Sequence, residues 1–300
     1  MRIQLKKVFL ISQIFIFLAC NSKIDPKITI SKVNGSPSYE NSKITSVEQK
    51  KVDNEYEFTF ELEEYELGVQ TETEYDYHLA NSDKGQHIHF IINNEPYSAH
   101  YSENFSKKME DGNNVILAFL SRSHHESVKN QDAYILTQIS DEPIDLNNEF
   151  LFYSRPKGTY KGKDTEKVLL DFYLVNTEIS ADGNKVRATI GDTVFLIDEW
   201  APYYIEGLNA GDTQIKLELI DINGNLIDVP FNPSIKTVSI DKSVAQNNSE
   251  NTNTSSKDSN SGSSSINTQY QNKKSLNGHY YYTDTKDGIN LLIYNRKNLK

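Results

Sequence analysis

The chain has 300 residues, of which 37% are hydrophobic, and it carries a formal net charge of -11 at pH 7. This acidic balance argues against a general affinity for nucleic acid, because a polyanion is bound by a clustered basic surface. The single cysteine excludes an internal disulfide, so each folded domain must be held by its own apolar core. The length and the polar last fifth predict two domains of about 95 residues with linkers.

Residues 1–20 have the order of a bacterial lipoprotein signal. A positively charged start is followed by an apolar run over 8–18, and the small Ala19 precedes Cys20. The run is too short to span a bilayer. We therefore expect Cys20 to be lipidated and to anchor the mature protein to a membrane of the bacterial cell envelope, most simply the outer membrane, on the extracytoplasmic side.

Residues 21–49 are polar and contain Pro26, Gly35 and Pro37 with little hydrophobic periodicity. This composition predicts a tether between the membrane and the first domain.

The pattern changes at Tyr56, where apolar and polar residues begin to alternate. Phe58, Phe60 and Leu62 continue the apolar positions, with acidic or polar residues between them. This period of two is typical of a strand with one buried face. Further strands are predicted at 87–92, 115–120 and 133–139, so we expect a first β-sandwich over 50–143.

A second series of strands follows the Pro156-Lys157-Gly158 turn. The predicted strands cover 168–175, 185–190, 193–197, 213–219, 226–229 and 234–240. Their turns are rich in Asn, Asp and Gly, which tolerate positive φ. We expect a second β-sandwich over 148–242, and an all-β fold of tandem immunoglobulin-like sandwiches.

The two series are similar to each other, which favours a repeated unit. Apolar positions stay in step when 58–62 is aligned with 170–174, 85–91 with 183–190, and 112–120 with 211–220. The first copy carries roughly fourteen extra residues around 71–82, between two paired strands. An extended loop in one copy of a repeat is a candidate binding element.

The C-terminal part is predicted to lack a packed domain. Residues 243–275 are dominated by Ser and Asn, so we expect a disordered linker. Residues 276–300 contain apolar and tyrosine-rich segments on either side of Asp287-Gly288, which predicts a short β-hairpin.

Six of the seven histidines lie within 48 residues of the first series. His87 and His89 are two apart on a predicted strand, so their side chains share one face. Neutral imidazoles on one face can converge on zinc or copper, with His100 or His124 as a third ligand. The alternative is a hydrogen-bonded surface patch that binds no metal and titrates near pH 6.5.

A second candidate site follows the strand at 115–120. The order Ser121-Arg122-Ser123-His124 is similar to the Ser-Arg-x-His signature of forkhead-associated domains, in which such residues hold a phosphothreonine. Arginine suits this task because it forms charge-assisted, bidentate bonds with phosphate. Ser121, Arg122, His124 and His125 are therefore candidate ligand-binding residues. The alternative is an Arg122 paired with Glu126 or with a carbonyl group at a sandwich edge.

Four sequence blocks resemble a family of Bacteroidota envelope lipoproteins whose members are often labelled phosphopeptide-binding proteins. The resemblance covers roughly 56–240. The blocks are GQHIHFI at 85–91, EPYSAHY at 95–101, AFLSRSHHESV at 118–128 and LFYSRPKG at 151–158. The resemblance implies an envelope lipoprotein with a binding role.

An enzyme is not expected, because the sequence has no GxSxG nucleophile turn and no carboxylate pair of a glycosidase can be singled out among its 42 acidic residues. The 18 tyrosines offer stacking surfaces for a glycan, a peptide or a protein partner. We therefore expect a lipid-anchored, non-catalytic binding or interaction protein without a cofactor. The zinc or copper site remains the alternative.

Overall fold

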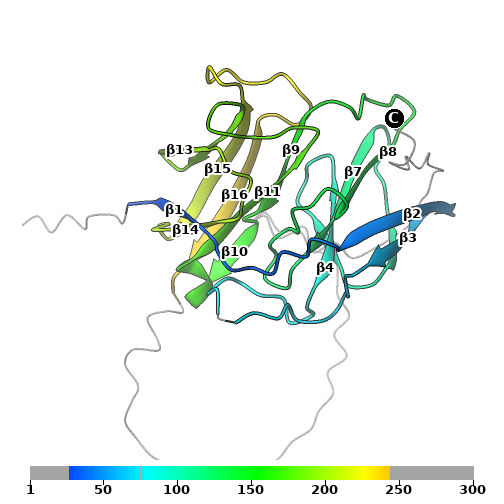
Figure 1. The fold of residues 1–300 in the computed structure, drawn as a ribbon, viewed down its shortest axis with the longest axis horizontal. Coiled ribbons are helices and arrows are strands. Elements are labelled where there is room, and N and C mark those ends of the chain that lie inside the picture. The colour runs from blue at the N-terminus through cyan, green and yellow to red at the C-terminus, as the bar shows by residue number, and fades with distance from the viewer. Residues whose placement is uncertain (1–26, 75, 244–300) are drawn as a thin grey trace, which may run out of the picture.

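The computed structural model describes residues 27–74 and 76–243 (Figure 1). The lipoprotein signal with Cys20, the start of the predicted tether, nearly all of the predicted linker and the predicted C-terminal hairpin lie outside the described residues. Within the described residues the chain is almost entirely β-structure, with one short 3-10 helix, η1 (Gly162–Thr165). No helix in this part of the chain is long and apolar enough to cross a membrane.

The first sandwich consists of two antiparallel sheets. One sheet has the order β2-β3-β6 and the other has the order β5-β4-β7-β8. The strands are β2 (Lys43–Val52), β3 (Glu55–Glu63), β4 (His87–Ile92), β5 (Ser98–His100), β6 (Asn104–Lys107), β7 (Asn114–Ser121) and β8 (Tyr134–Ile139). The predicted alternation is confirmed in β3, where Tyr56, Phe58 and Phe60 are buried in the sandwich core.

The second sandwich also consists of two sheets. Their orders are β1-β14-β11-β9 and β10-β16-β15-β12-β13. The strands are β1 (Thr29–Lys32), β9 (Phe150–Arg155), β10 (Gly158–Lys161), β11 (Val168–Val175), β12 (Lys185–Ile190), β13 (Thr193–Ile197), β14 (Tyr203–Glu206), β15 (Gly211–Ile220) and β16 (Ser234–Asp241). All pairings are antiparallel except that of β10 with β16.

The sheet order confirms the tandem repeat. β3 lies between two strands of its sheet, β2 and β6, and β11 likewise lies between β14 and β9. In the opposite sheets, the neighbours β4 and β7 correspond to the neighbours β12 and β15. These are the strands that the alignment of the two series paired. The connection between β3 and β4 covers residues 64–86, whereas that between β11 and β12 covers only 176–184. The predicted extra loop is therefore the β3–β4 connection.

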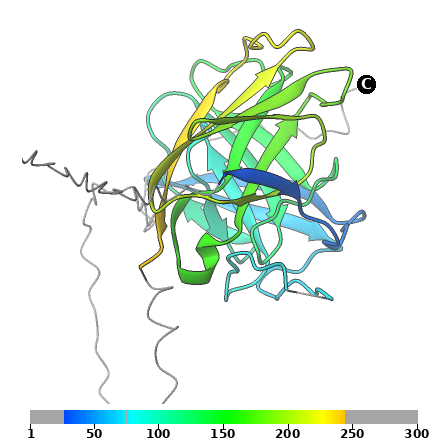
Figure 2. The same cartoon turned by 90° about the vertical axis from the view of Figure 1, so that its left-hand side faces the viewer.

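The two sandwiches stack face to face and form four layers (Figures 1 and 2). All eight residues of β7 and all eight of β11 are buried, because each strand faces a sandwich core on one side and the other sandwich on the other side. Strands buried on both faces are expected to have continuous apolar sequences. Phe119 of β7 and Tyr173 of β11 stack across the boundary with ring centroids 4.6 Å apart. A third apolar core thus joins the two sandwiches.

The prediction of a tether over 21–49 is wrong for the described part of that segment. β1 pairs with β14 and adds an edge strand to the second sandwich, and β2 begins at Lys43, inside the predicted tether. Ile28 and Ile30 pack against the second core, and Val33 is 3% exposed. The segment between β1 and β2 therefore lies along both sandwiches, and the predicted boundary at residue 50 falls within β2.

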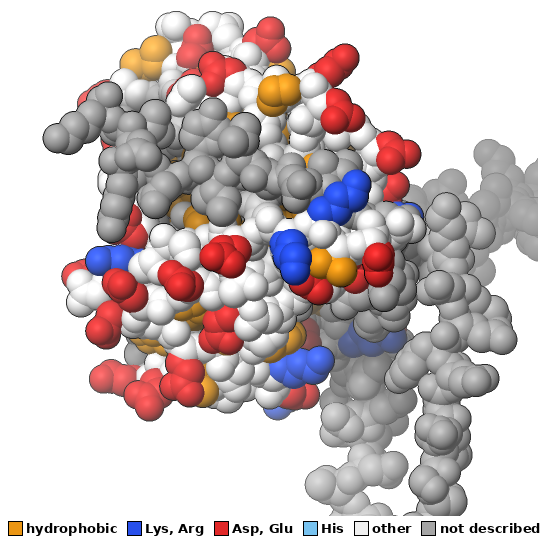
Figure 3. All heavy atoms as spheres, turned by 90° about the vertical axis from the view of Figure 1, so that its right-hand side faces the viewer, with side chains coloured by type: hydrophobic (Ala, Val, Ile, Leu, Met, Phe, Trp, Pro, Cys, Tyr) orange, Lys and Arg blue, Asp and Glu red, His pale blue; other side chains and the backbone are white. Residues whose placement is uncertain are grey.

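The outer face of the first sandwich is acidic. Figure 3 shows this face with many Asp and Glu side chains scattered over it and few Lys or Arg side chains. Glu57 and Glu61 of β3 are exposed and alternate with the buried core positions of that strand. Such a surface repels anions and gives no support to nucleic-acid binding.

Candidate functional site

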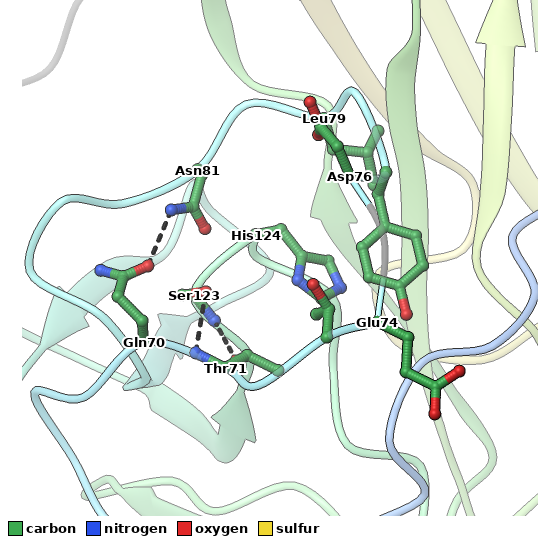
Figure 4. Close-up of a pocket in the computed structure, with 10 residues that line it drawn as sticks. Gln70, Thr71, Glu74, Asp76, Leu79, Asn81, Ser123 and His124 are labelled. Carbon is green, nitrogen blue, oxygen red and sulfur yellow. Dashed lines mark hydrogen bonds between the residues drawn. The ribbon is translucent and has the colours of Figure 1, made fainter.

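A pocket of about 490 Å³ lies between the long β3–β4 loop and the turn after β7 (Figure 4). This size is within the range of sites that hold small molecules. The pocket is lined by Gln70, Thr71, Thr73, Glu74, Asp76, Tyr77, Leu79, Asn81, Ser123 and His124. All but the last two come from the loop that the sequence marked as an insertion.

Hydrogen bonds hold the loop over the turn. The Ser123 amide donates to Thr71 Oγ1 at 2.9 Å, and the Thr71 amide donates to Ser123 Oγ at 3.2 Å. On the far side of the pocket, the Asn81 amide group donates to Gln70 Oε1 at 2.8 Å (Figure 4). The pocket wall is therefore a preformed polar frame.

The loop returns to β4 through a position that only glycine can occupy. Gly85 has a φ of +85°, and a Cβ built there would lie 2.3 Å from the carbonyl oxygen of Val69. The Gln86 amide donates to that same oxygen at 2.6 Å. This close backbone contact closes the base of the loop.

An aromatic pair forms one wall of the pocket. The rings of Tyr77 and His124 lie 4.8 Å apart between centroids. The Tyr77 hydroxyl donates to the Gly35 carbonyl oxygen at 2.7 Å, so the segment before β2 also supports the wall. The pocket thus offers ring faces together with hydroxyl, amide and carboxylate groups.

Behind the pocket, a buried ionic group holds His124. His124 Nε2 lies 3.1 Å from Glu126 Oε2, and Arg122 Nη1 lies 3.0 Å from Glu126 Oε1. Burial alone would raise the pKa of Glu126, but the Arg122 guanidinium and the hydrogen bond from His124 hold that pKa at about 2. The Glu126 carboxylate is thus ionised and orients the His124 ring.

Two of the candidate ligand-binding residues, Ser121 and Arg122, lack the exposure that recognition of a phosphate requires. Ser121 is 0% exposed and Arg122 is 3% exposed. Besides its ion pair, the Arg122 guanidinium donates to the carbonyl oxygens of Pro37 at 3.1 Å and Ser127 at 2.9 Å. The alternative stated for Arg122, a pair with Glu126 and with carbonyl groups, is confirmed. The guanidinium group thus has its partners inside the fold and is not presented to a ligand.

The two neighbouring histidines of this turn diverge. His124 lines the pocket, whereas His125 faces the layer between the sandwiches and lies 3.1 Å, Nδ1 to Nε2, from His87. His87 Nε2 and His89 Nε2 are 2.9 Å apart, so the predicted convergence of these two side chains is confirmed. Both residues are 0% exposed, so the surface-patch alternative is wrong for them. Burial lowers the pKa of His87 to about 4.

His100 does not join His87 and His89, so the prediction of His100 as third ligand is wrong. It pairs with Ile88 in the β4–β5 ladder and therefore faces the first core. Its ring stacks on Phe105 at a centroid distance of 3.5 Å, and its Nε2 lies 2.9 Å from the Ser98 hydroxyl. His125 takes its place in the cluster, and His124 lies elsewhere, in the pocket wall.

Two cationic residues near the histidine cluster were not expected from the sequence. Arg155 is buried at the end of β9, and its Nη1 donates to the Tyr160 hydroxyl at 3.1 Å. The Lys157 amine donates to the Tyr97 carbonyl oxygen at 2.7 Å, and burial together with Arg155 lowers the pKa of Lys157 to about 7. The only sequence signal for them was their place in the fourth resemblance block.

Comparisons with known proteins bear on the fold alone. No protein-family model matches the chain, and no curated protein matches it. Among solved structures, the chain is similar to fibronectin(III)-like modules of CbhA from Clostridium thermocellum, with 12% identity over 31% of this chain and 98% of that one and a TM-score of 0.25. It is also similar to the central fibronectin-III array of RIM-binding protein, with 10% identity over 70% and 71% of the two chains and a TM-score of 0.24. Likenesses this low say nothing about what the chain binds.

Proposed function

We propose that this chain is a non-catalytic binding protein of the bacterial cell envelope, anchored by a lipid on Cys20, and that its pocket takes a neutral, hydroxyl-rich ligand such as a glycan. The observation that carries the proposal is the polar pocket of about 490 Å³ beneath the β3–β4 loop. A repeat whose first copy alone has this loop supports a binding role for it.

The lining favours a glycan over a charged peptide. Amide and hydroxyl groups supply both donors and acceptors for sugar hydroxyls, and the Tyr77–His124 ring pair supplies a stacking surface. The carboxylates of Glu74 and Asp76 add acceptors. Because these two carboxylates are the acidic groups that line the pocket, they would repel a phosphate.

The phosphopeptide label of the resembling lipoproteins is supported less well. It would require a free arginine, and Arg122 is committed to Glu126 and to two backbone carbonyl groups. The resemblance itself supports an envelope location. β1 begins nine residues after Cys20, so a lipid anchor on Cys20 would hold the sandwiches within about 30 Å of the membrane.

Calorimetric titration of the chain from Asn21 to Lys300 with soluble neutral oligosaccharides, in parallel with a phosphothreonine peptide, tests the proposal. We expect an oligosaccharide to bind and the Glu74→Gln and Asn81→Ala variants to weaken that binding about tenfold each, as for the loss of one hydrogen bond to a charged or polar group.

Glu72→Gln is the matched control, because Glu72 is an exposed acidic residue of the same loop that does not line the pocket. We expect it to bind like the unmodified chain. Binding of the phosphothreonine peptide in place of every sugar would overturn the glycan proposal, and so would sugar binding that the Glu74 and Asn81 variants leave unchanged.

A further inference from the structure

Three histidine rings converge in the layer between the sandwiches, away from the pocket. His87 and His89 extend from β4, and His125 extends from the turn after β7. His87 Nε2 lies 2.9 Å from His89 Nε2 and 3.1 Å from His125 Nδ1, and one nitrogen from each ring lies within 4.8 Å of the others. The cluster uses none of the groups that line the pocket.

Each converging nitrogen also has a hydroxyl neighbour, because Ser121 Oγ lies 3.1 Å from His89 Nε2 and the Tyr97 hydroxyl lies 3.3 Å from His125 Nδ1. Hydrogen bonds can therefore serve the rings one at a time, but they do not explain why both rings are directed at His87. His87 Nδ1 lies 2.8 Å from the Gly85 carbonyl oxygen, which only accepts, so this nitrogen carries the proton. In the neutral ring, Nε2 of His87 then has a single lone pair. Two ring nitrogens, those of His89 and His125, approach that one lone pair. Only one of them can donate to it with good geometry, so the other is served by its neighbouring hydroxyl, that of Ser121 or of Tyr97.

A metal ion accounts for the convergence. Zinc or copper bound to imidazole has metal–nitrogen distances of about 2.0–2.1 Å, so nitrogens in a tetrahedral site lie roughly 3.3 Å apart. The observed separations of 2.9 Å and 3.1 Å would expand slightly to reach that value, and the separation between His89 and His125 is bounded by the 4.8 Å within which the three nitrogens lie.

The surroundings already orient the rings as in a metal site. The Gly85 carbonyl oxygen fixes the tautomer of His87, and the Ser154 hydroxyl lies 3.3 Å from His89 Nδ1. Such partners on the second ring nitrogen are the usual support of metal-bound histidines. Tyr97 stacks on His89 with a centroid distance of 3.4 Å and restricts the ring further. His125 has a φ of +68°, which turns its side chain away from that of His124.

The charges around the cluster select between ions. Arg155 and Lys157 both lie against the ring of Tyr97, with Arg155 Cζ 5.3 Å and Lys157 Nζ 3.7 Å from its centroid, and that ring stacks on His89 at a centroid distance of 3.4 Å. Their repulsion of a bound ion scales with the charge of the ion, and it is only weakly screened inside the fold. A monovalent ion is therefore repelled half as strongly as a divalent one.

We propose that His87, His89 and His125 bind one transition-metal ion, and that the site prefers copper(I) to zinc(II). The ligands are neutral imidazoles, a donor type that suits both metals, so charge and not ligand type sets the preference. Because Ser154 belongs to β9, the bound ion also ties the first sandwich to the second through His89.

The test is a competitive titration of the metal-stripped chain from Asn21 to Lys300. Copper(I) is titrated under anaerobic reducing conditions against a chromophoric copper(I) chelator, and zinc(II) against a zinc chelator. We expect one copper(I) ion per chain, bound more tightly than zinc(II), with an affinity at least about 100-fold lower in the His125→Gln variant. Imidazole NMR of the unmodified chain should show shifts of three histidines on addition of copper(I).

His100→Gln is the matched control, because His100 lies on the same sheet but faces the first core. We expect this variant to bind copper(I) as the unmodified chain does. The NMR experiment uses the unmodified chain, so it decides the question even if His125→Gln fails to fold. Failure to bind either ion, equal affinity in His125→Gln and the unmodified chain, or shifts of other histidines would overturn the site. Tighter binding of zinc(II) would overturn the copper preference.

Discussion

Replacing Arg122 with Met should expose how strongly the turn after β7 depends on its buried ion pair. Arg122 and Glu126 are joined at 3.0 Å, and each side chain is 4% exposed. Methionine keeps the length of the side chain but removes the charge, so the Glu126 carboxylate stays buried without its cation. Breaking a buried pair in this way costs about 3–5 kcal/mol. We expect a loss of that size in the free energy of unfolding at pH 7.

The loss should depend on pH in a definite direction. In the unmodified chain the pKa of Glu126 is about 2, below the ordinary value of 4.5, so its ionisation stabilises the fold above pH 4.5 and this contribution is lost as the pH falls toward 2. The difference corresponds to about 3 kcal/mol. Without Arg122, burial raises the pKa of Glu126, so the variant loses stability as the pH rises above 4.5. The difference in the free energy of unfolding between the unmodified chain and the Arg122→Met variant should therefore decrease by at least about 1 kcal/mol from pH 7 to pH 4.

Urea unfolding followed by the fluorescence of Trp200, the single tryptophan, measures both quantities. Arg187→Met is the control, because Arg187 also pairs with a glutamate, Glu218, but its own side chain is 29% exposed and Glu218 keeps a second cation, Lys216, at 3.0 Å. We expect that control to lose less than about 1 kcal/mol. Two results would refute the reasoning: an equal loss in the free energy of unfolding for the Arg122 and Arg187 variants, or a difference between the Arg122 variant and the unmodified chain that is the same at pH 4 and pH 7. Either result would mean that Glu126 does not hold Arg122 firmly, and Arg122 would again be a candidate for phosphate binding.

Two further predictions concern the architecture. A chain that begins at Gly35 lacks β1 and loses the burial of Ile28, Ile30 and Val33. We expect its free energy of unfolding to be about 4 kcal/mol lower than that of a chain that begins at Lys27. Equal melting temperatures of the two chains would mean that β1 does not contribute to stability. Phe119→Ala should cost about 3–5 kcal/mol while the two sandwiches still unfold in one calorimetric transition, because Phe119 packs in the core that joins them. Two separate transitions in the unmodified chain would contradict that reasoning.

Most strands of both sandwiches could be predicted because their patterns are local. The alternation from Tyr56 to Leu62 and the continuous apolar run at 115–120 each report the burial of one strand without reference to the rest of the chain. β1 could not be predicted in the same way. It is four residues long, and its partners Tyr203 to Glu206 lie more than 170 residues later in the chain.

The histidine cluster was predicted in part, and there is a physical reason why two of its residues could be predicted and the third could not. The spacing of His87 and His89 places them on one strand face, which the period of a strand guarantees. The choice of His125 over His100 depends on which face of the sheet each residue meets, and this is set by the register of the short strand β5 and by the turn at Arg122. Neither the register of β5 nor this turn is encoded in a local sequence pattern. For the same reason, the pairing of Glu126 with Arg122 could be stated only as an alternative.

The position of β1 also imposes an order on folding. β1 is among the first parts of the folded region to be synthesised, yet it can dock only after β14 has formed, more than 170 residues later. Contacts of such long sequence separation form slowly. Until β1 arrives, the free edge of β14 is an unpaired strand edge, which can pair with another chain. A newly synthesised molecule therefore passes through a stage in which its second sandwich is built but vulnerable to aggregation. That stage ends when β1 pairs with β14 and closes the edge.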